Sequence, residues 1–145
     1  MPSLETQPKL KVVVSDAAFT VDKICKVANV VQHPTLDHSK LLEWVMKEIV
    51  DADVLFCRGP LPVDKLMLDQ AKHLKAVVTM AVGYDNIDVV ECNERGIKMG
   101  YAGNCLTEAT AEFTVALLLA TSRRILEAVH FATLQIFWAN HWKLL

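Results

Sequence analysis

The sequence predicts a doubly wound α/β fold, in which a parallel sheet of flavodoxin-like order is followed by a long C-terminal helix. Three observations support this prediction. Short β-branched runs recur along most of the chain, and several are continuously apolar, as in parallel strands buried on both faces. Segments with helical periodicity separate the runs, which predicts right-handed helical crossovers. Past residue 107 the pattern becomes a continuous apolar helical stretch.

Five strands are predicted from runs of β-branched and other apolar residues. They span residues 10–15, 29–32, 53–57, 75–80 and 96–101. The intervals between them leave room for the helical crossovers that parallel strands require.

Three helices are predicted between these strands. The first has an apolar stripe at the 3.6 period over residues 41–50, with Asp37 and Ser39 as candidate caps. The second spans about 63–71, because the prolines just before it cannot lie inside a helix. The third follows a capping Asn86 and ends at Gly96.

The last third of the chain has no glycine or proline from Thr107 through more than two dozen residues, which indicates one long helix or two in tandem. Its apolar residues occupy successive helix positions and continue past Arg123 and Arg124 into an aromatic tail. Such a tail on a small domain needs a partner surface. The tail contains Phe131, Leu134, Ile136, Phe137, Trp138 and Trp142.

Composition restricts the possible partners. The 145 residues are 52% hydrophobic with a formal net charge of −2, which describes a soluble globular domain. No basic block is present to bind a nucleic acid, and no apolar run reaches the length that spans a membrane. The first nine residues match no targeting pattern, so a cytoplasmic protein is expected.

The cysteines and histidines do not form a recognisable chemical motif. The four cysteines include no CxxC pair, so zinc and redox sites are not expected, and Cys25 and Cys57 are predicted to be buried. The five histidines have no convergent partner in the sequence, and each is predicted to be solvated or packed rather than catalytic. We therefore predict no catalytic residue and no metal ligand.

The glycine-rich stretch at residues 96–103 fails as a dinucleotide fingerprint. Its glycines are spaced by four and three residues, whereas the fingerprint needs two and three between a strand and the following helix. These glycines are interpreted as turn residues that flank a strand.

A candidate anion site lies at residues 79–88, where a buried strand ends in Val82 and Gly83 before a helix. Ligands of such sheets bind beyond the carboxyl ends of the strands, and glycine lets the backbone approach an anion closely. Successive amides of Gly83 and Tyr84 could hold a carboxylate. The alternative is an ordinary turn between a strand and a helix.

Residues 75–124 resemble the amino-terminal part of the D-isomer-specific 2-hydroxyacid dehydrogenases, most closely the glyoxylate/hydroxypyruvate reductase branch. Three blocks match in order: a strand followed by VGYD, then ERGI and a second strand, then LTEATAE opening a long helix that ends in RR. The resemblance implies hydride transfer from NADH or NADPH to a 2-oxo acid. It also implies that the preceding strands and helices form the substrate-binding domain.

The resemblance assigns roles to a few residues. It implies that the backbone of Val82 and Gly83 binds the substrate carboxylate and that Thr107 contacts the nicotinamide, although Thr107 could instead be a helix cap. The family's Arg, His and carboxylate of catalysis cannot be placed in this chain. Trp142 with Lys143 resembles part of the family's dimerisation arm, and the alternative is packing under a helix.

The sequence thus predicts a truncated relative of these enzymes, with a substrate-binding domain at 1–102. Residues 103–145 would be the first helix of a truncated cofactor domain and part of a dimerisation arm. The chain alone is expected to be inactive, to bind no dinucleotide tightly, and to form a homodimer through its C-terminal segment. A non-enzymatic carboxylate-binding or oligomerisation module is the alternative, and a receiver domain with only Asp16 in its acidic pocket ranks last.

Overall fold

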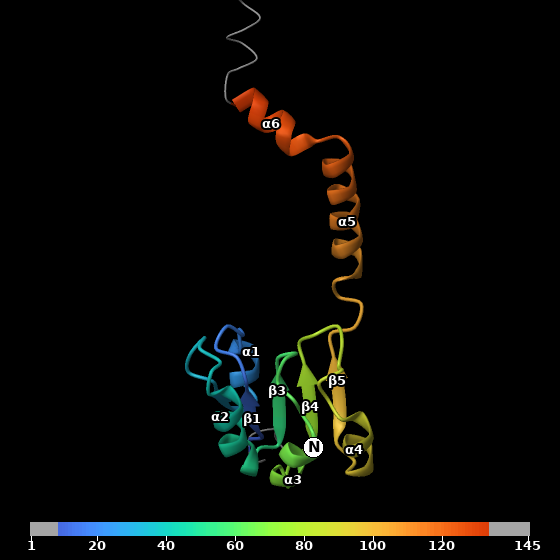
Figure 1. Ribbon diagram of the computed structural model, residues 1–145. Helices are drawn as coiled ribbons and strands as arrows, with labels where there is room; N and C mark the ends of the chain where they lie inside the picture. Colours follow the sequence, from blue (N-terminus) through green and yellow to red (C-terminus); the bar gives the residue numbers. More distant parts are fainter. Residues whose placement is uncertain (1–8, 134–145) are drawn as a thin grey trace, which may run out of the picture. The chain divides into compact units, whose positions relative to one another are not determined.

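The computed structural model describes residues 9–133 and confirms the predicted α/β fold (Figure 1). Five parallel strands form one sheet in the order β2-β1-β3-β4-β5, the predicted doubly wound order. The strands are β1 (Lys11–Val14), β2 (Asn29–Gln32), β3 (Val54–Cys57), β4 (Ala76–Thr79) and β5 (Lys98–Tyr101).

Alternate residues of the central strands face two separate hydrophobic clusters, which explains why these strands are continuously apolar. Val13 and Leu55 belong to the larger cluster, which the helices on one face complete with residues such as Val45 and Met67. Val12 and Val14 belong to the smaller cluster, on the other face. Burial on both faces thus selects β-branched residues at every position of β1.

Helices connect the strands near the predicted positions. They are α1 (Asp22–Cys25), α2 (Leu41–Glu48) continued by a 3₁₀ turn η2 (Ile49–Asp51), α3 (Lys65–Gln70) and α4 (Val89–Glu94). The single turn α1 escaped prediction, because four residues are too few to display a periodic stripe. Gly96 ends α4 as predicted, and its φ of +70° is the left-handed conformation that glycine favours after a helix.

Two predicted helix caps are wrong. The cap of α4 is Asp88, whose carboxylate accepts a hydrogen bond from the Glu91 N–H at 3.0 Å, and not Asn86. The residue before α2 is Lys40, which makes no side-chain cap. Asp37 instead accepts from the N–H of Ser39 at 2.9 Å within the preceding loop.

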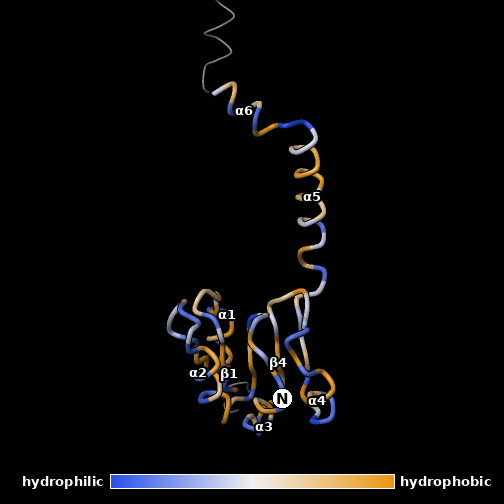
Figure 2. The backbone as a smooth tube through the Cα atoms, in the orientation of Figure 1, coloured by the Kyte–Doolittle hydropathy of each residue, from blue (hydrophilic) through white to orange (hydrophobic). Residues whose placement is uncertain are grey.

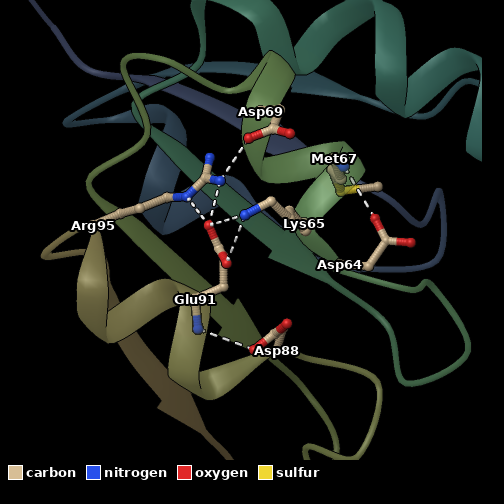
Figure 3. Close-up of polar contacts among 7 residues, drawn as sticks. All are labelled: Asp64, Lys65, Met67, Asp69, Asp88, Glu91 and Arg95. Atoms are coloured by element: carbon tan, nitrogen blue, oxygen red, sulfur yellow. Dashed lines mark hydrogen bonds and ion pairs between the residues drawn. The ribbon is translucent and has the colours of Figure 1, made fainter.

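Charged side chains connect α3 and α4 on their outer faces (Figure 3). Arg95 pairs with Glu91 and with Asp69, the latter at 2.6 Å, and Lys65 lies 3.4 Å from Glu91. Exposed pairs of this kind contribute little stability individually. Their consequence here is geometric: they join α3 to α4, and the loops that precede these two helices both lead from the carboxyl edge of the sheet.

The cysteines that are buried are not the two that the sequence predicts to be buried. Cys57 is buried as expected, but Cys25 is exposed, and Cys92 is buried. The helical period of α1 directs Ile24 into the smaller cluster, which leaves Cys25 on the outside.

The chain divides into two compact units, Met1–Gly103 and Asn104–Leu145. In the second unit, α5 (Thr107–Ser122) and α6 (Ile125–Thr133) are two helices in tandem. The break falls at Arg124, which has a φ of +52°. Figure 2 shows hydrophobic residues along most of α5, and the polar stretch at the break. None of the helices in the described range is both long and apolar enough to cross a membrane.

Candidate functional site

A cavity of about 540 Å³ opens at the carboxyl edge of the sheet in the first unit. Residues that directly follow β1, β3 and β4 form its walls, as expected for ligand sites in open α/β sheets. Its lining consists of Asp16, Ala18, Phe19, Arg58, Gly59, Pro60, Met80 and Ala81. The cavity therefore adjoins, along the chain, the turn that contains Val82 and Gly83.

Asp16 and Arg58 form the polar wall of this cavity. The Asp16 carboxylate is 1% exposed and accepts hydrogen bonds from Arg58 Nη1 at 2.7 Å and from the Ala18 N–H at 2.8 Å. The Arg58 side chain is 53% exposed and follows β3 directly. The backbone bond from Ala18, together with the Arg58 guanidinium, holds the pKa of Asp16 below its usual range. Asp16 thus fixes the orientation of a cation that faces the cavity.

Replacing Asp16 with asparagine should lower the free energy of unfolding by about 1 to 3 kcal/mol at pH 7, because a buried charged hydrogen-bond partner is lost. The folded-state pKa of Asp16 is depressed, so its contribution is complete above the unfolded-state pKa. It disappears as the pH falls through the folded-state value. Urea unfolding of both chains at pH 7 and at a series of pH values descending well below the ordinary aspartate pKa, followed by circular dichroism, measures how the difference shrinks.

The matched control for this substitution is Glu94→Gln, which removes an exposed carboxylate at the end of α4. It should leave the unfolding midpoint within experimental error at pH 7. A difference between Asp16→Asn and the unsubstituted chain that persists in acid would contradict the role given to the Asp16 charge.

The turn after β4 presents three successive backbone donors. Within residues 9–133, the N–H groups of Val82, Gly83 and Tyr84 donate to no protein acceptor. The backbone is held on both sides of them: Ala102 N–H donates to the Ala81 carbonyl at 3.0 Å, and Ile87 N–H donates to the Tyr84 carbonyl at 2.9 Å. Such a run of free amides is suited to a small anion.

Glycine at position 83 is explained by the limited space for a side chain and not by the backbone conformation. Among the described glycines, only Gly96 has a positive φ, so a substitution at Gly83 meets no left-handed strain. A Cβ at Gly83 would instead lie 2.9 Å from Oδ2 of Asp85. The Asp85 carboxylate therefore lies close to the turn and adds negative charge beside it.

Two tyrosines lie next to the turn. The Tyr84 and Tyr101 rings are 5.1 Å apart at an interplanar angle of 66°, an edge-to-face arrangement. Tyr101 also contacts the backbone of Gly103, where a Cβ would lie 2.6 Å from the ring. Both tyrosines are about half exposed, so they form an aromatic surface beside the free amides.

Comparison with known proteins identifies the family. The family model described as D-isomer specific 2-hydroxyacid dehydrogenase, catalytic domain, matches residues 12–138. The chain belongs to this family. Among curated proteins it is similar to the glyoxylate reductase of Thermofilum pendens, 37% identical over 124 residues, which cover 84% of this chain and 36% of that protein.

Solved structures agree on the fold of this chain. The TT0316 protein of Thermus thermophilus superposes with a TM-score of 0.73 at 31% identity, covering 86% of this chain and 40% of that one. The D-lactate dehydrogenase of Aquifex aeolicus, complexed with NAD and lactic acid, gives a TM-score of 0.68. At 21% identity, covering 85% of this chain and 37% of that one, it supports the fold alone. The chain spans about a third of the length of the curated relatives it matches.

Thr107 lies in the second unit, as the first residue of α5, and its side chain is exposed. The alternative interpretation of Thr107 as a helix cap is wrong, because the cap position is Leu106 and it makes no side-chain bond. The nicotinamide contact that the dehydrogenase family implies for Thr107 stays a prediction.

The described residues of this chain do not fit a dinucleotide pyrophosphate. Gly59, Gly83 and Gly103 each lie singly in the loops after β3, β4 and β5, so no loop from a strand to a helix N-terminus in the described range carries the closely spaced glycines that cradle a pyrophosphate. The described residues also contain no group of three potential metal ligands.

The histidines make local contacts. His33 is buried, donates from Nδ1 to the Thr35 carbonyl at 2.7 Å and packs edge-on against Trp44. His38 Nε2 lies 3.9 Å from Asp16, and His130 lies on α6. His141 and the tail residues Trp138, Trp142 and Lys143 lie outside the described residues.

The Asp16–Arg58 pair is the part of the site that sequence reasoning missed. In the sequence Asp16 is a candidate only for the acidic pocket of a receiver domain, and no motif marks Arg58. The available signal was positional: each residue follows a predicted buried strand closely, so both had to reach the same edge of a parallel sheet.

Proposed function

We propose that this chain is the substrate-binding part of an NAD(P)-dependent D-2-hydroxyacid dehydrogenase of the glyoxylate or hydroxypyruvate reductase type. The observation that supports it best is the run of free amides at Val82, Gly83 and Tyr84, beside a cavity with a fixed arginine. A small 2-oxo acid would place its carboxylate on the amides of Val82 and Gly83, and its remaining atoms would extend toward the cavity.

The chain's own residues bind and orient the substrate in this proposal. Backbone donors hold the carboxylate without a formal charge, and the Arg58 guanidinium attracts an anion toward the cavity. Thr107 would face the nicotinamide of NADH or NADPH in a full-length relative, where the cofactor would supply the hydride. Because the described residues do not fit a dinucleotide site, we assign the isolated chain no hydride-transfer step. The cytoplasmic location and the homodimer predicted from the sequence belong to the same proposal.

A non-enzymatic carboxylate-binding or oligomerisation module remains the second candidate. The specific observation that favours it is α5, which exposes large apolar residues on successive positions and so offers a surface for association. Under either function the free amides of the turn would bind a carboxylate. The two candidates therefore agree on carboxylate binding by this chain, and they differ in whether the chain supports turnover when it is part of a complete dehydrogenase.

Titration of the ¹⁵N-labelled chain with glyoxylate tests the carboxylate site. The Val82 and Gly83 amide resonances should shift saturably, because an anion accepting their hydrogen bonds deshields the protons. Glycolaldehyde, which has the same carbon skeleton without the carboxylate, should cause no comparable shift. Equal responses to both compounds, or none to glyoxylate, would rule out a carboxylate site at this turn.

The purified 145-residue chain should not oxidise NADH or NADPH in the presence of glyoxylate or hydroxypyruvate. The physical reason is that no glycine loop among the described residues can hold the pyrophosphate. Absorbance at 340 nm measures the rate, with the same purification from cells lacking the expression plasmid as the control. Turnover above that control would overturn the proposed inactivity.

A further inference from the structure

A buried polar group lies directly beneath the turn. Cys57 and Thr79 are the last residues of β3 and β4, they are paired in register, and their side chains are 0% and 1% exposed. The Cys57 thiol interacts with the side chains of both Thr79 and Asn86. Burial raises the pKa of Cys57 to about 11, so the thiol is neutral in this environment. The group therefore adds hydrogen bonds without adding charge.

Asn86 connects the two loops that border the cavity. Its side-chain Nδ2 donates to the Leu61 carbonyl at 2.7 Å, and its backbone carbonyl accepts from the Val63 N–H at 2.8 Å. Val63 and Ile87 form a parallel bridge beside these bonds. One residue thus joins the loop after β3, which contains Arg58, to the loop after β4, which contains Val82 and Gly83.

The free amides lie between two fixed points. On the β4 side, the Met80 N–H donates to the Cys57 carbonyl at 3.1 Å and the Ala81 N–H donates to Thr79 Oγ1 at 3.3 Å. On the α4 side, the Ile87 N–H donates to the Tyr84 carbonyl at 2.9 Å, and Asn86 fixes the end of the turn to the loop after β3. Loss of the Asn86 contacts would loosen residues 82–85, because within the described range their own N–H groups bond nothing in the protein.

We propose that Asn86 is a positioning residue for carboxylate binding: its side-chain amide, seated on the buried Cys57–Thr79 pair, holds the Val82–Gly83 turn against the loop of Arg58. The inference rests on the proposed function of that turn. It also explains why an asparagine that could have capped α4 leaves that role to Asp88, since its side chain is already bonded across the cavity loops.

Asn86→Asp in the full 145-residue chain is the informative variant. A carboxylate has the same shape but no N–H to donate, so it would face the Leu61 carbonyl with two acceptors in contact. We expect its dissociation constant for glyoxylate, measured by amide shifts, to rise at least tenfold. Asn93→Asp adds the same charge at an exposed position of α4 and should change the constant less than twofold.

A second control separates positioning from stability. Ile97 is buried directly before β5, at the amino edge of the sheet and away from the cavity. Ile97→Val shortens this side chain and should lower the unfolding temperature while leaving glyoxylate affinity unchanged. Asn86→Ser is a milder substitution, because serine is uncharged and its side chain is too short to reach the Leu61 carbonyl. It serves as the test variant if Asn86→Asp does not fold. All titrations are made at a temperature where every variant is folded.

Amide hydrogen exchange gives an independent measure of position. In Asn86→Asp, exchange at Val63 and Ile87 should accelerate at least tenfold, while exchange at Val13 in the central strand stays unchanged. Glyoxylate affinity within twofold of the unsubstituted chain in both Asn86 variants, or unaltered exchange at Val63 and Ile87, would overturn the inference. Absence of glyoxylate binding by the unsubstituted chain would contradict the proposed function, and the exchange rates would still decide whether Asn86 holds the turn.

Discussion

Replacing Gly83 with valine is expected to weaken glyoxylate binding by the chain at least tenfold, a loss of about 1.4 kcal/mol or more. The new side chain would occupy the space beside the free amides, where the Cβ position already lies 2.9 Å from the Asp85 carboxylate. The fold should survive, because Gly83 is exposed and its φ is not in the left-handed region. Amide-shift titration measures the affinity, and the dispersion of the same spectrum reports the fold.

Two further variants make this prediction specific. Gly100→Ala adds a Cβ inside β5, where it would meet Val78 at an ordinary 3.7 Å, and should not change glyoxylate affinity. Asp85→Asn removes a like charge next to the turn and should tighten binding, by about threefold to tenfold at low salt and less at high salt. An unchanged affinity in Gly83→Val would remove the turn from the candidate site.

Most of the fold was predictable because a strand buried on both faces of the sheet is apolar at every position. Val12, Val13 and Val14 are all apolar, since each contacts one of the two clusters. The helix caps were less predictable. Asn86 and Asp88 are both good caps two residues apart, and the choice depends on the bond from Asn86 to Leu61, which is distant in sequence.

The part of the candidate site that lies in one contiguous segment was predictable. The parts that combine residues distant in the sequence were not. The turn at Val82 and Gly83 is a single segment, so its free amides could be anticipated from a strand that ends before a helix. Asp16 and Arg58 are separated by 42 residues, and only the strand order places them together. The Cys57, Thr79 and Asn86 group escaped for the same reason, because its members look like an ordinary core cysteine, a strand threonine and a turn residue.

Substitution of one exposed leucine of α5 is expected to weaken self-association of the chain at least tenfold. Leu118 is 66% exposed, and Phe113 and Leu117 on the same helix are also exposed. A leucine buried in an interface contributes about 1.5 to 3 kcal/mol, and a lysine in its place would put a charge there in each copy. We therefore expect the unsubstituted chain to form a dimer whose dissociation constant, measured by sedimentation equilibrium, rises in Leu118→Lys.

The matched control is Leu66→Lys on α3, since Leu66 is 72% exposed but lies in the first unit. It should leave the dissociation constant unchanged, which would show that solubility alone is not the cause. Removing residues 125–145 should weaken association without abolishing it, because the apolar residues of α5 remain. Polydisperse material in place of a dimer would indicate an interface whose proper partner is missing. A monomer in every variant would mean that the apolar residues of the second unit pack within their own chain, and would exclude the proposed homodimer.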